Sequence, residues 1–107
     1  MPIYNKLVRD KIPEVIESNG KKFLTKILSY EEYIIELKNK SFEELEEYCN
    51  AETREGALEE LADVMEIIHA LAKSHGSTLK EVEEIRRKKA EKRGAFDEKI
   101  FLIEVED

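Results

Sequence analysis

Apolar residues recur every three or four positions in three long segments of the chain. These segments cover about residues 30–50, 55–74 and 78–93, and this spacing is typical of amphipathic helices. Thr78 followed by Glu81 indicates a capping box at the start of the last helix. The pattern therefore predicts a mainly helical protein.

Two shorter kinds of element flank the long helices. Residues 13–19 are predicted to form a helix of about two turns, because Pro13 suits a first helical turn and Gly20 suits a left-handed stop. Residues 23–28 alternate in side-chain character, and residues 99–105 are rich in β-branched and apolar side chains. We expect these two segments to pair as strands. The expected fold is a helical-bundle subunit with a small two-stranded β element.

The length and the charge of the chain bear on its number of domains, its oligomeric state and its partners. The chain has 107 residues, of which 41% are hydrophobic and 40% charged, with a formal net charge of −7. This suffices for one small domain over residues 1–107, and its thin core favours a homodimer or higher homo-oligomer. The acidic balance argues against nucleic acid as a partner, because a polyanion would meet a repulsive field.

Cysteine usage and hydropathy bear on the compartment. Cys49 is the single cysteine, so an intramolecular disulfide is excluded and a reducing compartment is expected. We interpret Cys49 as a small core residue. The amino terminus lacks the apolar run of a secretory signal, and no window approaches the ~20 apolar residues of a membrane span. A cytoplasmic protein without membrane contact is expected.

Carboxylates lean toward the apolar faces of the first two long helices. With ~100° between residues, Glu60 projects inside the apolar arc of the second helix and Asp63 lies at its edge. On the first helix, Glu44 borders the apolar arc, Glu47 lies next to it, and Glu43 points further out. Two antiparallel helices joined by a short turn would bring the two pairs together.

A carboxylate aimed into an apolar seam needs a positive partner, because its desolvation costs several kcal/mol. An ion pair with Lys or Arg is one solution. Four such carboxylates exceed what one basic side chain neutralises, which favours a divalent cation. Oxygen ligands without His or thiolate select Mg²⁺ or Mn²⁺ over zinc.

Basic residues supply the complementary charge. Arg86, Lys89 and Arg93 fall on the inner arc of the last helix, where they would pair with the acidic cluster or hold the oxygens of a phosphorylated ligand. The opening segment adds further candidates, with a solvated amino terminus as the alternative. They are Asn5, Lys6, Arg9 and Lys11.

The carboxylate motif resembles that of a known superfamily. Glu43-Glu44-x-x-Glu47, followed by Glu60-x-x-Asp63, is similar to the metal-binding signature of the all-α nucleoside triphosphate pyrophosphohydrolases, the MazG-like and phosphoribosyl-ATP pyrophosphohydrolase-like superfamily. The opening YNKLVRDKIP and the closing KAEKRGAF resemble the ends of a small single-domain house-cleaning subgroup.

The resemblance implies a Mg²⁺-dependent enzyme that cleaves a nucleoside triphosphate to a monophosphate and pyrophosphate. It implies four metal ligands, which are Glu44, Glu47, Glu60 and Asp63. Glu47 is our candidate for polarising the attacking water, and Glu43 for orienting a ligand or serving a second metal. Phosphate contacts are implied for Asn5, Lys6, Arg9, Lys11, Lys89 and Arg93, to which the helical wheel adds Arg86. Ala95 departs from a second Gly that is frequent in the family.

Two alternatives stay open at this point. The substrate is either a free, non-canonical nucleoside triphosphate or an adduct such as phosphoribosyl-ATP, since no residue decides the base or sugar. A non-enzymatic helical dimerisation module, with charged faces that only confer solubility, would explain the same helices without a metal.

Overall fold

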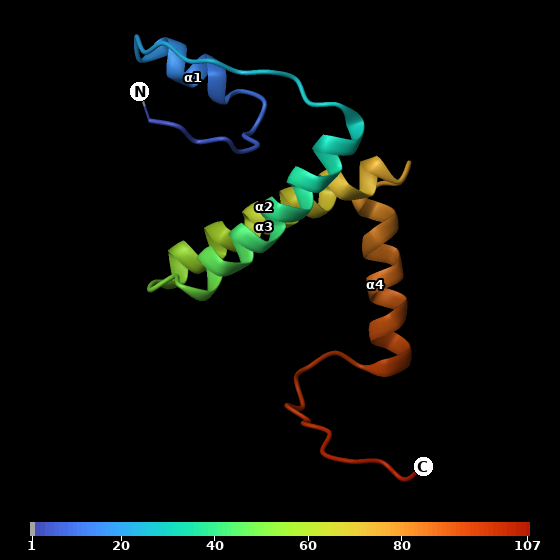
Figure 1. The fold of residues 1–107 in the computed structure, drawn as a ribbon. Coiled ribbons are helices and arrows are strands. Elements are labelled where there is room, and N and C mark those ends of the chain that lie inside the picture. Colours follow the sequence, from blue (N-terminus) through green and yellow to red (C-terminus); the bar gives the residue numbers. More distant parts are fainter. Residues whose placement is uncertain (1) are drawn as a thin grey trace.

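The computed structural model describes residues 2–107 and contains four helices in this range (Figure 1). They are α1 (Ile12–Ser18), α2 (Tyr30–Cys49), α3 (Arg54–Ser74) and α4 (Leu79–Arg93). Each helix begins and ends within one residue of its predicted bounds. The prediction of a mainly helical chain is confirmed.

Side-chain caps fix where α2 and α3 begin. Ser29 and Glu32 form a full capping box at α2: the Glu32 N–H donates to Ser29 Oγ, and the Ser29 N–H donates to Glu32 Oε1, both at 3.2 Å. At α3, the Gly56 N–H donates to Thr53 Oγ1 at 3.0 Å. Both caps satisfy backbone donors that have no partner inside the helix.

The predicted capping box at α4 is half formed. The Glu81 N–H donates to Thr78 Oγ1 at 3.1 Å, but the Glu81 carboxylate accepts from Ser77 Oγ instead of returning to the Thr78 backbone. Gly94 ends the helix with φ of 83°, a left-handed conformation that favours glycine.

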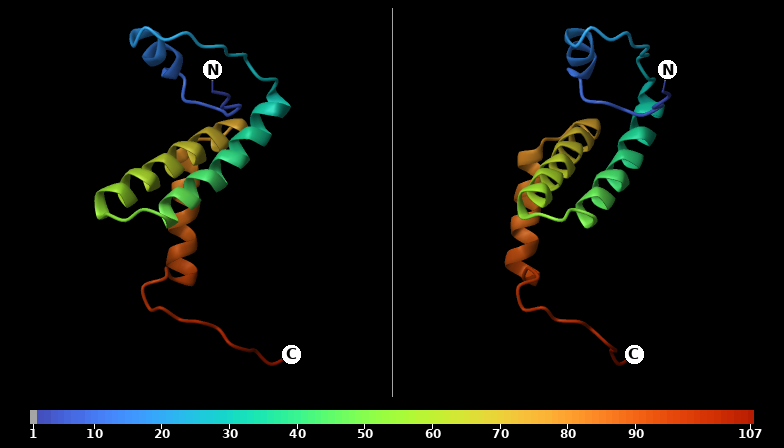
Figure 2. Two further views of the ribbon diagram at one scale, coloured as in Figure 1. Left: turned by 60° about the vertical axis from the view of Figure 1, so that its left-hand side comes forward. Right: turned by 90° about the vertical axis from the view of Figure 1, so that its left-hand side faces the viewer.

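Helices α2 and α3 run antiparallel and side by side as a hairpin, which both turned views show (Figure 2). The buried apolar side chains lie in this hairpin, namely Leu37 on α2 and Ile67 and Ala72 on α3. At its open end, the Tyr30 hydroxyl donates to the Ser74 carbonyl at 2.6 Å. The hairpin is the part of the chain that positions the carboxylates.

The rest of the chain extends away from this hairpin. Helix α4 packs against the end of α3, and the C-terminal tail continues beyond it (Figure 1). The radius of gyration is 18.3 Å, whereas a compact chain of this length has about 13 Å. Many large apolar side chains are therefore exposed. Cys49 is also exposed, so its interpretation as a core residue was wrong.

The expected two-stranded β element is not observed. No strand occurs in residues 2–107, and residues 23–28 and 99–105 are extended but unpaired. The two segments lie at opposite ends of the molecule (Figure 1). An isolated two-stranded ribbon is marginal without a face to pack on, so β propensity alone did not bring them together.

Among residues 2–107, no helix combines the length and the apolar character needed to cross a bilayer.

Candidate metal centre

Three carboxylates converge between α2 and α3. Glu44 and Glu47 stand one turn apart on α2, and Glu60 faces them from α3. One oxygen of each lies within 4.8 Å of the others. Glu44 is buried, with 7% of its surface exposed, while Glu60 is half-buried and Glu47 is exposed. The group is thus closed on one side and open to solvent at Glu47.

Two of the carboxylate oxygens in this group have no hydrogen-bond donor. Glu44 Oε2 and Glu60 Oε2 are buried and unpartnered within the described residues. A buried carboxylate oxygen without a partner costs free energy. The arrangement is therefore incomplete until a proton or a cation joins it.

Lys40 supplies the one basic contact to the group in the described part of the chain. Its Nζ lies 3.5 Å from Glu44 Oε1, one helical turn away. Three ionised carboxylates and this one lysine leave a charge of −2. The lysine was not among the predicted site residues, although its spacing of four from Glu44 could have revealed it.

The pKa of Glu60 is raised by its surroundings in this group. Burial is the largest cause, and hydrogen bonding to and repulsion from Glu44 and Glu47 add to it. Together they raise the pKa of Glu60 to about 7. A proton held on Glu60 would donate to its neighbours and relieve the repulsion among the three carboxylates.

Asp63 lies outside this group. Arg9 Nη2 donates to Asp63 Oδ1 at 2.6 Å, so the opening segment is tied to α3 across 54 positions of sequence. Three of the four predicted ligands are thus brought together, and the fourth is engaged by an ion pair. Glu43 is partly buried on α2 and is not one of the three converging residues.

Among residues 2–107, no ion pair or side-chain hydrogen bond joins the other predicted residues of the opening segment to the converging carboxylates. Lys6 Nζ sits 5.8 Å from the ring centroid of Tyr4. Asn5 has a positive φ of 44°, and Lys11 precedes the first turn of α1. All three are exposed.

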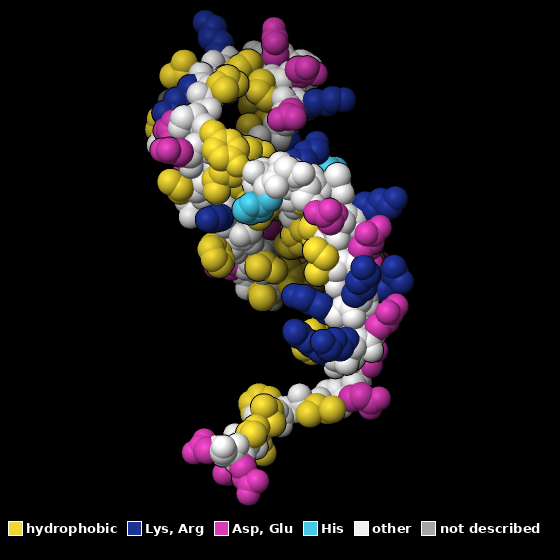
Figure 3. All heavy atoms as spheres, turned by 90° about the vertical axis from the view of Figure 1, so that its right-hand side faces the viewer, with side chains coloured by type: hydrophobic (Ala, Val, Ile, Leu, Met, Phe, Trp, Pro, Cys, Tyr) yellow, Lys and Arg dark blue, Asp and Glu magenta, His cyan; other side chains and the backbone are white. Residues whose placement is uncertain are grey.

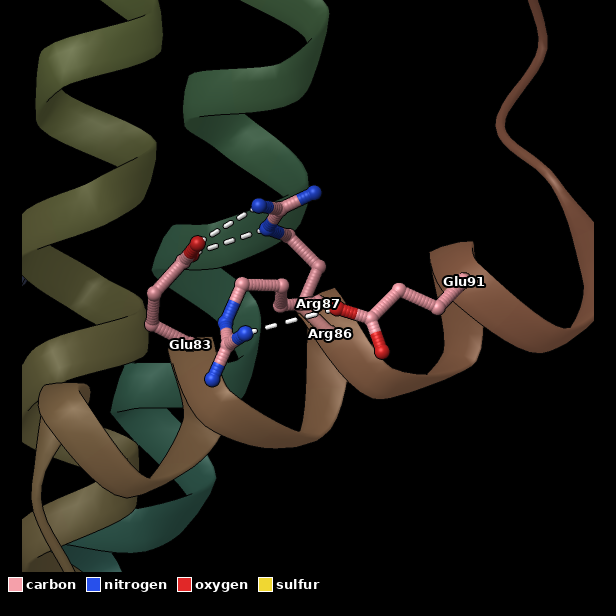
Figure 4. Close-up of polar contacts among 4 residues, drawn as sticks. All are labelled: Glu83, Arg86, Arg87 and Glu91. Carbon is pink, nitrogen blue, oxygen red and sulfur yellow. Dashed lines mark hydrogen bonds and ion pairs between the residues drawn. The ribbon is translucent and has the colours of Figure 1, made fainter.

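Two arginines on α4 are held by acidic residues of the same helix (Figure 4). Arg86 donates from Nε to Glu83 Oε2 at 2.8 Å and from Nη2 to Glu83 Oε1 at 2.5 Å. This two-pronged contact lowers the pKa of Glu83 and raises the pKa of Arg86. Arg87 similarly lies 3.4 Å from Glu91.

The predicted basic residues of α4 share one cavity. It has a volume of about 590 Å³ and is lined by Arg86, Lys89, Ala90, Arg93, Gly94, Ala95 and Phe96. Figure 3 shows the Lys and Arg side chains gathered along this helix. The cavity contains no residue of α2 or α3, so the basic and acidic candidates form two separate sites in one chain.

Comparison with known proteins gives a partial relative. A protein of Mycolicibacterium smegmatis (strain ATCC 700084 / mc(2)155), described as an uncharacterized protein, is 45% identical to the chain over 53 residues. The match covers 50% of this chain and 54% of that protein, so the chain spans about half the length of the curated relative it matches. No family model matches the sequence, and no solved structure matches it.

Proposed function

We propose that the protein is a Mg²⁺-dependent nucleoside triphosphate pyrophosphohydrolase, which releases pyrophosphate and a nucleoside monophosphate. The observation that carries the proposal is the convergence of Glu44, Glu47 and Glu60, with two buried oxygens that find no donor among residues 2–107. The resemblance of these residues to the pyrophosphohydrolase signature supports the same reaction. Non-canonical triphosphates are the proposed substrates.

The donor set fits Mg²⁺, and Mn²⁺ as its substitute. All three converging groups are carboxylates, and neither His nor Cys is among them. Hard oxygen ligands suit these cations. The residual charge of −2 at the group matches one divalent cation, which Lys40 alone does not neutralise.

Each residue has a separate role in the proposed reaction. Glu44 and Glu60 would hold the cation. When bound, the cation polarises phosphate oxygens and makes water more acidic. Glu47 is exposed and can therefore accept a proton from water that attacks the α-phosphorus. Within one chain Lys89 and Arg93 line a cavity separate from the carboxylates. They would hold the phosphate oxygens and stabilise the charge on the leaving group in an assembly that brings this cavity to the carboxylate group of a second copy.

A homodimer is part of this proposal. Leu58, Leu61, Met65 and Ile68 form a stripe on α3 with spacings of three, four and three. We call it the α3 stripe. Its members are between 39% and 55% exposed. This spacing is that of a helix-to-helix seam, and a second copy would cover it. The same stripe would equally serve a dimerisation module without catalytic activity.

The deciding experiment is a pyrophosphate-release assay with ordinary and modified nucleoside triphosphates, and with phosphoribosyl-ATP, in Mg²⁺ or Mn²⁺. We expect turnover that EDTA abolishes. Glu60→Gln should reduce it to background, whereas Glu59→Gln should retain it, because Glu59 is the exposed neighbour on the same helix. Equal turnover in the two variants would refute the assignment of Glu60 to the site. No turnover in the unaltered protein would refute the hydrolase and favour the dimerisation module.

A further inference from the structure

Two extended apolar segments have open backbone edges. They are residues 23–28, which precede α2, and residues 100–105, which end near the C-terminus. Among residues 2–107, no backbone-to-backbone hydrogen bond involves either segment. Leu24 is 96% exposed and Leu102 is 73% exposed. Unpaired N–H and C=O groups beside apolar side chains form a template for another strand.

The two segments match in length. Each has six residues and, as a strand, spans about 20 Å. Both are rich in residues that favour strands, such as Phe23 and Ile27 in the first and Phe101 and Ile103 in the second. They suit each other as partners in a strand pair.

One chain does not bring them together. The segments lie at opposite ends of a molecule that is 60 Å long (Figure 1). After α4 ends, only residues 94–99 precede the second segment, and six residues span at most about 22 Å. Pairing within one chain would therefore require α4 to leave its place against α3.

The charged residues beside the two segments indicate which segment pairs with which. The first segment is accompanied by Lys21, Lys22 and Lys26 and by no acidic residue. Lys26 makes only a distant contact, 4.0 Å from Glu32. The second segment is surrounded by acidic residues, with Lys99 as the one basic side chain. These are Asp97, Glu98, Glu104, Glu106 and Asp107. Figure 3 shows apolar side chains along the tail and acidic side chains gathered at its tip. Two basic first segments would repel each other, as would two acidic second segments, whereas a first and a second segment attract each other.

We propose that two copies of the chain exchange their tails, so that residues 23–28 of one copy pair with residues 100–105 of the other. Twofold symmetry repeats the pairing at both ends of the dimer. The contact is independent of the proposed hydrolase, because it uses no residue of the carboxylate group or of the α4 cavity lining.

An antiparallel register satisfies the charges. With Leu24 opposite Leu102, Lys22 lies opposite Glu104, and Lys26 lies diagonally next to Glu98 on the same face. Phe23 and Ile103 then meet on the other face. Alternation of side chains places Phe101 on the face away from Leu24.

A mixing experiment with single cysteines tests both the pairing and its partner. In a Cys49→Ser background, Leu24→Cys in one protein and Leu102→Cys in another are mixed and oxidised. We expect a disulfide-linked species of twice the 12.5 kDa chain that contains one copy of each. Leu24→Cys mixed with Phe101→Cys is the matched control and should give little of it. Circular dichroism checks that the helices persist, which is expected because both positions are exposed.

Two results would overturn the proposal. One is the absence of the mixed species. The other is a Leu24→Cys/Leu102→Cys double variant that forms its disulfide within one chain when diluted, since that shows pairing inside a monomer. Either result leaves the pyrophosphate-release assay unaffected, so failure of this proposal is distinguishable from failure of the hydrolase.

Charge reversal gives a second, independent test. Lys22→Glu/Lys26→Glu in one protein and Glu98→Lys/Glu104→Lys in the other, each with its cysteine at position 24 or 102, should cross-link with each other. Two cysteine-bearing copies of the same reversed charge type should cross-link at least several-fold less, because like charges then face each other. Equal cross-linking in matched and mismatched mixtures would overturn the assignment of the partner by charge.

Discussion

Glu44 on α2 and Glu60 on α3 each present a buried carboxylate oxygen that no donor satisfies in the part of the chain that the structure describes. Burying a carboxylate costs free energy. In addition, one oxygen of each of these two residues and one oxygen of Glu47 lie within 4.8 Å of one another. Lys40 compensates only Glu44. The pair therefore stores an electrostatic penalty, and any cation or proton that removes the penalty stabilises the fold.

Mg²⁺ should raise the melting temperature. A ligand at a hundred times its Kd stabilises the native state by about 2.7 kcal/mol, which corresponds to a shift on the order of 10 °C for a domain of this size. Differential scanning fluorimetry with increasing MgCl₂, reversed by EDTA, measures this. Glu60→Gln should lose most of the shift, because it removes one of the converging ligands.

Glu59→Gln and Glu66→Gln are the controls for this measurement. Both residues are exposed on the opposite face of α3, and both variants should keep the full shift. A shift that is equally small in every variant and in the unaltered protein would indicate weak screening by salt instead of a site.

Stability of the metal-free protein should fall as pH rises from about 4.5 to about 7. The pKa of Glu60 is raised from 4.5 to about 7 in the folded state, so the native state holds this proton longer than the unfolded chain does. The stabilisation is complete below the unfolded pKa and is lost through the folded pKa. Urea unfolding at several pH values, with EDTA, measures the slope.

Glu60→Gln should flatten this dependence, since glutamine does not titrate. Saturating Mg²⁺ should remove it as well, because the cation replaces the proton. Magnesium affinity in turn should rise over the same pH interval. A metal-free protein whose stability is constant from pH 4.5 to 7 would contradict the assignment.

The helices could be predicted from the sequence because their signals are local. Apolar spacing, Pro13 and Gly94 are each read within a few residues of the boundary that they mark, and the observed bounds agree within one residue. The β element could not be predicted in this way. Its segments have strand propensity, but pairing depends on whether the helices between them bring them together, which one-dimensional patterns do not contain.

In the candidate site, too, the local features could be predicted from the sequence and the long-range contact could not. A helical wheel gives the direction of Glu44, Glu47 and Glu60, and these three converge. It gives no information about a basic side chain that another part of the fold places beside one of these carboxylates. Arg9 reaches Asp63 from 54 positions away, and that distant contact separates Asp63 from the other three.

The contact between Arg9 and Asp63 should behave as a tether of modest energy. Both side chains are more than a third exposed, so a coupling free energy of about 0.2–1 kcal/mol is expected. Urea unfolding of Arg9→Gln, Asp63→Asn and the double variant gives it by a double-mutant cycle. Hydrogen exchange should rise in residues 2–11 of both single variants. Loosening of this segment in only one of them would argue against the ion pair as its anchor.

Glu83→Gln should strengthen anion binding at the α4 cavity. Glu83 occupies two donors of Arg86, and removing its charge frees a guanidinium that lines the cavity. Titration with pyrophosphate, followed by calorimetry, should show a several-fold lower Kd than in the unaltered protein. Glu91→Gln is the matched control, since Glu91 contacts Arg87, which does not line the cavity. Equal affinities in the two variants would show that Arg86 does not bind the anion.

Met65→Glu should weaken the proposed homodimer by at least tenfold in Kd. Met65 lies in the α3 stripe and is 55% exposed, so the new charge costs little in a single chain but would be buried against a second copy. Sedimentation velocity over a range of concentrations measures the change. Lys73→Glu, also exposed on α3, adds negative charge outside the stripe and should leave the dimer intact. If both variants sediment like the unaltered protein, the α3 stripe is not covered by a second copy, and the apolar contacts of an assembly must lie on another face.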